Sequence, residues 1–113
     1  MNINKVVVIG SGTMGSGIAA HLCNADIPVV LLDLKTEIAE KAKEKILKSR
    51  PPLLFAKDKI NSLKVGNIKD DFYNVSDADW IIEAVVERID IKHDIYKKIF
   101  DKRKKNSIVS SNT

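Results

Sequence analysis

Residues 5–17 read KVVVIGSGTMGSG, and this stretch decides the fold. The run at 5–9 is apolar, rich in β-branched residues and without polar alternation, which predicts a parallel strand covered on both faces. A G-x-G-x-x-G pattern follows at once, and apolar side chains then recur at helical spacing over residues 13–25. A strand, a glycine-rich turn and a helix in this order are typical of a dinucleotide-binding unit.

The glycines of this turn have separate physical roles. Gly10 allows the tight turn out of the strand, Gly12 lets a diphosphate approach the backbone, and Gly15 lets the helix pack close to the sheet. The free N–H groups at the start of the helix favour an anion there. The other loop residues expected to contact the cofactor are Ser11, Thr13 and Met14. A glycine-rich turn without a ligand is the alternative interpretation.

Asp33 ends the next apolar run, close to the spacing of about 20 residues at which a carboxylate binds the adenosine ribose. A carboxylate accepts hydrogen bonds from both ribose hydroxyls and repels a 2′-phosphate, so Asp33 favours NAD over NADP. Lys35 could tolerate a phosphate, and an ordinary solvated Asp at a strand end is the alternative.

Apolar runs and helical patterns alternate along the whole chain, which predicts an α/β fold with a Rossmann-type, doubly wound parallel sheet. The sheet is expected to be incomplete at its C-terminal side, because no helix follows the last strand. The strands are predicted at 5–9, 29–33, 60–65, 80–86 and 107–111, and the helices at 13–25, 37–49 and 89–104. Side chains expected to face the core are Met14, Ile18, Leu22, Ala25, Ile38, Ala42, Ile46, Leu47, Ile91, Ile95, Ile99 and Phe100, with residues 53–55 capping it.

Length and composition limit the function. With 113 residues, the chain suffices for one domain, residues 1–113, and not for a pocket that encloses both a cofactor and a second substrate. One cysteine excludes a disulfide framework and favours a reducing compartment, here the cytoplasm. The sequence contains no signal peptide and no run long enough to span a membrane. The net charge of +4 suits an anionic ligand. The basic run at 102–105 has no interleaved aromatic residues, so it is interpreted as a solvated helix end and not as a nucleic-acid site.

Few other residues suggest chemistry. Glu83 and Glu87 lie in and just after a predicted strand, where at least one should face the cofactor. His21 and His93 are interpreted as packing or surface residues, and Cys23 as a small packing residue. No metal site is predicted.

Four segments together resemble the NAD-binding domain of the 3-hydroxyacyl-CoA dehydrogenases of fatty-acid β-oxidation. These segments are residues 7–19 (VVIGSGTMGSGIA), 30–33 (VLLD), 79–87 (DWIIEAVVE) and 108–113 (IVSSNT). Gly66-Asn67 and the Trp-Ile-Ile-Glu phrase are most similar to the larger bacterial members, the α-subunits of fatty-acid oxidation complexes. The resemblance implies oxidation of (3S)-3-hydroxyacyl-CoA to 3-oxoacyl-CoA, with hydride transfer to NAD.

The resemblance also implies roles for single residues. Glu87 and Lys92 match positions that contact the nicotinamide half of NAD, and Ser49 falls where the family touches the coenzyme A moiety. Asn112 adjoins the active-site serine of a Ser-Asn-Thr-Ser motif. The chain stops one residue short of that serine, and the family's catalytic His-Glu pair and its helical substrate and dimerisation domain lie further downstream. We therefore expect no catalytic residue in this chain.

Two main hypotheses follow, and a different dehydrogenase with a Rossmann-type domain is a third possibility. The first is a truncated NAD-binding domain that binds NAD with little or no turnover, acyl-CoA being the substrate of the full-length parent. The second is a non-catalytic remnant or interaction module, which folds with a partner chain or a second copy covering the exposed sheet edge.

Overall fold

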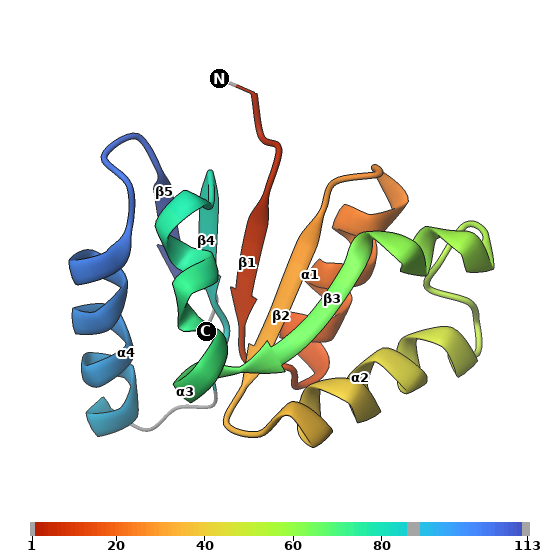
Figure 1. The fold of residues 1–113 in the computed structure, drawn as a ribbon. Helices are drawn as coiled ribbons and strands as arrows, with labels where there is room; N and C mark the ends of the chain where they lie inside the picture. The colour runs from red at the N-terminus through yellow and green to blue at the C-terminus, as the bar shows by residue number, and fades with distance from the viewer. Residues whose placement is uncertain (1, 86–88, 112–113) are drawn as a thin grey trace.

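The computed structural model describes residues 2–85 and 89–111. Its centre is one parallel sheet of five strands in the order β3-β2-β1-β4-β5 (Figure 1). The strands are β1 (Val6–Ile9), β2 (Val29–Asp33), β3 (Leu63–Asn67), β4 (Trp80–Glu83) and β5 (Ile108–Ser111). The order reverses at β1, which confirms the prediction of a doubly wound, Rossmann-type sheet.

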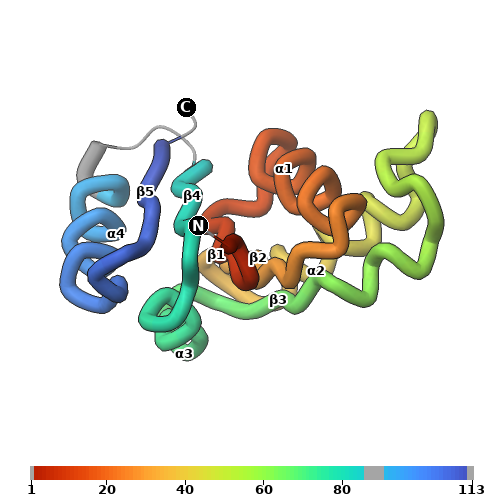
Figure 2. The backbone as a smooth tube through the Cα atoms, turned by 90° about the horizontal axis from the view of Figure 1, so that it is seen from above, coloured from red at the N-terminus to blue at the C-terminus, as the bar shows by residue number. Residues whose placement is uncertain are grey.

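Helices cover both faces of this sheet. They are α1 (Thr13–Asn24), α2 (Thr36–Lys48), α3 (Ile68–Asp71) and α4 (Ile89–Lys102), with 3₁₀ helices η1 (Lys57–Ser62) and η2 (Phe72–Asp77). Seen from above, α1 and α3 lie on opposite sides of the sheet (Figure 2). None of the helices in the described part of the chain is long and apolar enough to cross a membrane.

Alternation along β1 divides the core into two clusters. Val6 and Val8 pack with α1, α2 and Leu54, whereas Val7 and Ile9 pack with α4 and η2. All four β1 side chains are completely buried, as expected for a central parallel strand.

The predicted inner face of α1 is wrong. Gly15, Ala19, Ala20 and Cys23 are buried, whereas Met14 is 53% exposed, Ala25 is exposed, and Ile18 and Leu22 pack at the margin of the core. The reason is the close approach of this helix to the sheet, which leaves room only for small side chains. The larger apolar residues are displaced to the flank.

Other core predictions need smaller corrections. Ala39, Ala42 and Ile46 form the buried face of α2, and Ile95 and Ile99 are buried on α4, with Ile91 at the margin of that cluster. The apolar residues that were expected inside and are exposed are Ile38, Leu47, Leu53, Phe55 and Phe100. Each lies next to a buried position of its helix or loop, so the periodicity predicted too wide an apolar face.

Some element boundaries also differ from the predictions. β3 begins at Leu63 and runs through Gly66 and Asn67, because it pairs with β2 as far as Asn67 opposite Asp33. Asn67 also caps α3, since its Oδ1 accepts the N–H of Asp70 at 2.7 Å. β4 ends at Glu83, ahead of the predicted end at 86, a residue outside those described. α4 ends at Lys102, two residues before the predicted end at 104.

Candidate functional site

The carboxyl ends of the strands meet at the lower edge of the sheet in Figure 1. After β1 the chain continues to β2, on one side of the sheet, and after β4 it continues to β5, on the other side. In a parallel sheet, the point between two such diverging connections is the crevice in which ligands bind. A cleft of about 190 Å³ lies at this edge, and its walls include Gly10, Gly12, Asp33, Ala84 and Val85. The predicted cofactor residues of β1 and β2 therefore share one cleft with the end of β4.

The structure confirms the turn role assigned to Gly10 and the packing role assigned to Gly15. Gly10 has φ +107°, and a Cβ there would lie 2.5 Å from the carbonyl oxygen of Ala84. A Cβ on Gly15 would lie 1.8 Å from the carbonyl oxygen of Gly10. Both contacts are with backbone, so neither position accepts a larger residue without moving a strand or α1.

Gly12 differs from these two, because a Cβ built on it meets no atom of the described chain within 4 Å. It is the N-cap of α1 and has ordinary extended backbone angles, φ −69° and ψ −168°. Neither packing nor backbone strain therefore requires glycine here. The space beside Gly12 and the N–H groups of the first turn of α1 fit an anionic group that approaches the backbone closely.

Asp33 is held against the glycine loop. Its Oδ2 accepts the N–H of Ser11 at 2.8 Å and the Ser11 hydroxyl at 2.5 Å, and its Oδ1 accepts the N–H of Leu34 at 2.7 Å. A carboxylate has about four acceptor positions, so about one remains for a ligand. The hydroxyl oxygen of Ser11, which donates its proton to Asp33, can itself accept a hydrogen bond from a second hydroxyl group of a ligand. Sequence reasoning missed this pairing, because nothing in the sequence relates two residues at the ends of neighbouring strands.

The carboxyl end of β4 carries a buried acid. Glu83 is 0% exposed, and its carboxylate is engaged by the protein itself, so it does not face the cleft openly. Lys92 lies in the first turn of α4, and its side chain is 16% exposed. The predicted site residues Glu87 and Asn112 lie outside the described residues.

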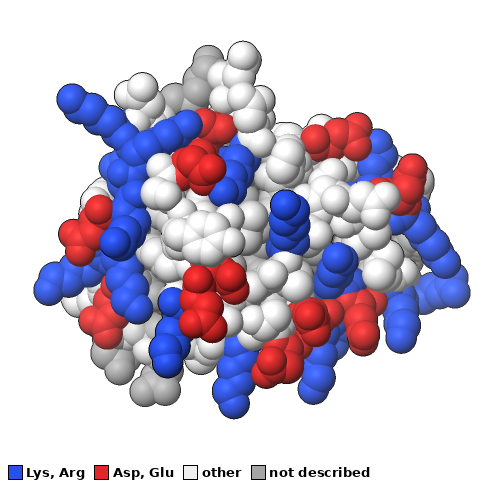
Figure 3. Space-filling model, in the orientation of Figure 1, with Lys and Arg blue, Asp and Glu red and all other residues white. Residues whose placement is uncertain are grey.

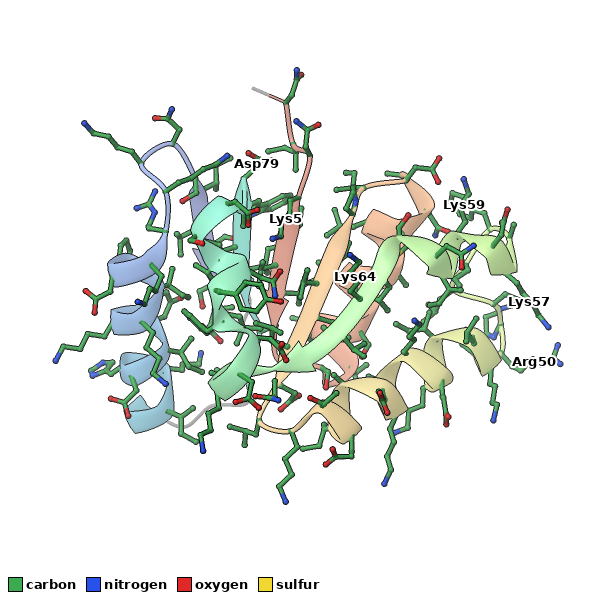
Figure 4. All side chains as sticks on the ribbon, in the orientation of Figure 1. Lys5, Arg50, Lys57, Lys59, Lys64 and Asp79 are labelled. Carbon is green, nitrogen blue, oxygen red and sulfur yellow. The ribbon has the colours of Figure 1, made fainter. Side chains whose placement is uncertain are left out.

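Ser49 follows α2 directly, as the C-cap of this helix. Its hydroxyl donates to the carbonyl of Ile46 at 3.0 Å and accepts the N–H of Leu53 at 2.9 Å. It lines a pocket of about 410 Å³ together with Arg50 and Lys57, which are labelled in Figure 4. Ser49 does not line the cleft beside Asp33, but it also lines a second pocket of about 340 Å³ together with Ser11 and Gly12 of the glycine turn.

The remaining candidates stay outside the site. His21 and His93 are exposed, whereas Cys23 is buried, and this burial raises the pKa of its thiol, while the positive charge of Lys43 acts in the opposite direction. Residues 2–85 and 89–111 contain no group of three or more His, Cys, Asp or Glu side chains that could hold a metal ion. Basic and acidic side chains are both spread over the face in Figure 3.

Comparison with known proteins agrees with this geometry. The sequence profile of the family described as "3-hydroxyacyl-CoA dehydrogenase, NAD binding domain" matches residues 5–113. A Deinococcus radiodurans protein named "Probable 3-hydroxyacyl-CoA dehydrogenase" is 42% identical over 120 aligned positions, which cover 100% of this chain and 35% of that protein. The "Peroxisomal fatty acid beta-oxidation multifunctional protein AIM1" of Arabidopsis thaliana is 36% identical, with 98% of this chain and 16% of that protein covered.

Solved structures share the fold. The 3-hydroxybutyryl-CoA dehydrogenase of Escherichia coli K12 superposes with a TM-score of 0.85 at 30% identity, covering 100% of this chain and 25% of that chain. The dehydrogenase part of a multifunctional enzyme from C. elegans superposes with a TM-score of 0.77 at 28% identity, covering 100% and 27%. This chain thus spans between 16% and 35% of the length of these four proteins.

Proposed function

Because this chain belongs to the family of 3-hydroxyacyl-CoA dehydrogenase NAD-binding domains, we propose that residues 1–113 bind NAD for the oxidation of (3S)-3-hydroxyacyl-CoA to 3-oxoacyl-CoA. The observation that carries the proposal is the cleft in which Gly12, the start of α1 and Asp33 meet beside the end of β4. When bound, NAD would accept a hydride from the substrate carbon that bears the hydroxyl group.

The adenosine half is assigned to the β1–β2 side of the cleft. Gly12 and the N–H groups of the first turn of α1, at Thr13, Met14 and Gly15, would bind the diphosphate. Asp33 and the Ser11 hydroxyl would bind the ribose hydroxyls. The position of Asp33 is fixed by hydrogen bonds from Ser11 and Leu34, so it cannot turn away from a 2′-phosphate, which supports NAD rather than NADP.

The nicotinamide half is assigned to the β4 side, with Lys92, Glu87 and Asn112 as its proposed contacts. Lys92 supplies a cation near the end of β4, while the other two rest on the family resemblance. We assign the acid–base chemistry to residues outside this chain, because the relatives are at least twice as long. Residues 1–113 alone should therefore bind NAD with little or no turnover.

Ser49 is proposed to contact coenzyme A. Its hydroxyl has both a donor and an acceptor partner within the chain, so it would act through its remaining lone pair. Arg50 and Lys57 line the same pocket and would attract the phosphates of the coenzyme.

A second candidate function is an interaction module that associates with a partner chain or with a second copy. The observation behind it is that β5 lies at the edge of the parallel sheet. Size-exclusion chromatography with light scattering distinguishes the two, because a stable monomer without NAD argues against partner-dependent folding. For the location, we propose the cytoplasm, where a reduced Cys23 would be maintained.

Isothermal titration of the chain with NAD and with NADP tests the cofactor proposal. We expect NAD to bind at least about tenfold more tightly, with Asp33→Asn reducing the preference, since charge repulsion and ribose binding both depend on this carboxylate. The control is Asp101→Asn, which makes the same substitution at an exposed position near the C-terminal end of α4. Tighter binding of NADP than of NAD would overturn the role of Asp33.

A further inference from the structure

Glu83 is a completely buried carboxylate at the ligand edge of the sheet. It ends β4 and pairs in register with Ile9 of β1 on one side and Ser111 of β5 on the other. A buried carboxylate is costly unless protein groups replace its water, so its partners show what this residue holds in place.

One partner is the turn that forms a wall of the cleft. The Oε2 atom of Glu83 accepts the N–H of Val85 at 2.7 Å. This bond fixes the peptide that follows Ala84, whose carbonyl lies against Gly10. Both Ala84 and Val85 line the cleft beside Gly12. The Glu83 side chain thus sets the path of the backbone at the end of β4.

Two further partners meet at the other oxygen. Oε1 accepts the hydroxyl of Ser111 at 2.9 Å and lies 3.8 Å from the ammonium nitrogen of Lys92. Ser111 is the last residue of β5, and Lys92 belongs to the first turn of α4. The Glu83 carboxylate therefore links the turn at residues 84–85, the end of β5 and the start of α4.

The position of Lys92 argues against a purely structural network. A cation in the first turn of a helix is disfavoured by the helix dipole, and burying most of its side chain adds to the cost. Stability alone would be served better by an uncharged side chain at this position. The charge of Glu83 offsets this cost and keeps the ammonium at the β4 side of the cleft.

We propose that Glu83 is a positioning residue for the nicotinamide half of the cofactor: it holds Lys92 and the 84–85 turn where that half binds. The inference rests on the proposed NAD site, and it assigns to Glu83 no direct contact with the cofactor.

The test compares two ligands of the 113-residue chain, NADH and ADP. ADP carries the adenosine and the diphosphate but lacks the second ribose and the nicotinamide. In Glu83→Gln, the dissociation constant of NADH should rise on the order of tenfold, because an amide cannot accept from Val85, Ser111 and Lys92 together. That of ADP should stay within about twofold. The nicotinamide fluorescence of bound NADH should move toward that of free NADH.

Ser111→Ala is the second variant, since it removes one Glu83 partner at an exposed position. It should weaken NADH several-fold and leave ADP unchanged. Asp101→Asn, which removes a negative charge at an exposed position near the C-terminal end of α4, should leave the affinities for both ligands unchanged.

The outcomes separate the two proposals. If the unmodified chain binds neither NADH nor ADP, the cofactor site itself is refuted, and the role of Glu83 with it. If it binds both and Glu83→Gln weakens them equally or not at all, only the role of Glu83 is refuted. Should Glu83→Gln fail to show a cooperative unfolding transition, Ser111→Ala decides, and an unchanged ratio of NADH to ADP affinity then overturns the proposal.

Discussion

Replacing Gly15 by alanine should damage the fold itself. The added Cβ would lie 1.8 Å from the Gly10 carbonyl oxygen, whereas ordinary contact begins at 3.4 Å, so the gap between α1 and the glycine turn has to open by about 1.6 Å. The obstacle is backbone, which cannot rotate away as a flexible side chain can. Overpacking of a core costs about 1–3 kcal/mol, and we expect Gly15→Ala at the upper end.

Gly17→Ala is the matched control in the same helix. A Cβ there meets no atom of the described residues within 4 Å, so alanine should stabilise α1 by up to about 1 kcal/mol through its higher helix propensity. The same substitution, glycine to alanine, should therefore lower the free energy of unfolding at position 15 and raise it at position 17.

Urea unfolding followed by the fluorescence of Trp80, the single tryptophan, measures both free energies of unfolding. A loss of about 3 kcal/mol in Gly15→Ala would lower the melting temperature by roughly 10 °C in a domain of this size. Equal stability of Gly15→Ala and the unmodified chain, or equal losses in both variants, would refute the packing role of Gly15.

Two other predictions concern the site and the opposite end of the sheet. Gly12→Ala should change the free energy of unfolding by no more than about 1 kcal/mol, which is the scale of a helix cap. It should weaken the binding of NADH at least about tenfold, as measured by fluorescence titration, because the added Cβ occupies the space beside the backbone. An unchanged affinity for NADH would contradict this role of Gly12. Asp79, labelled in Figure 4, accepts from Lys104 and from the N–H of Asn4, which lowers its pKa from the usual 3.8. Its stabilisation should be present above about pH 4 and be lost as the pH falls through the lowered pKa. The difference in free energy of unfolding between the unmodified chain and Asp79→Asn should therefore become smaller in acid. Urea unfolding of both proteins from pH 2.5 to 7 measures this difference, and a constant difference would contradict the prediction.

The sequence predicts the fold because its strongest signals are local. The run before Gly10 is apolar without alternation, and the turn that follows requires glycine at two positions for reasons that the structure shows as backbone contacts. The inner face of α1 could not be predicted in the same way. Hydrophobic periodicity favours Met14, whereas the close approach of the helix selects Gly15 and Ala19.

The candidate site is predictable in its members and not in its connections. The glycines and Asp33 follow from the fingerprint, but the bond from Ser11 to Asp33 depends on two strand ends that lie side by side only in the folded sheet. The same holds for Glu83, whose partners come from β5 and α4. The spacing of residues along the sequence cannot predict contacts between different strand ends until the order of the strands in the sheet is known.

Titration of the isotope-labelled chain with NAD, followed by amide chemical shifts, tests the central claim most directly. Binding at the proposed cleft predicts that the largest shifts fall on Ser11, Gly12, Thr13 and Val85, with saturation at one NAD per chain. The amides of η1 (Lys57–Ser62), which lie away from this edge, should not move. Shifts centred on η1, or none at millimolar NAD, would contradict the assignment of the cofactor to the carboxyl edge of β1 and β4.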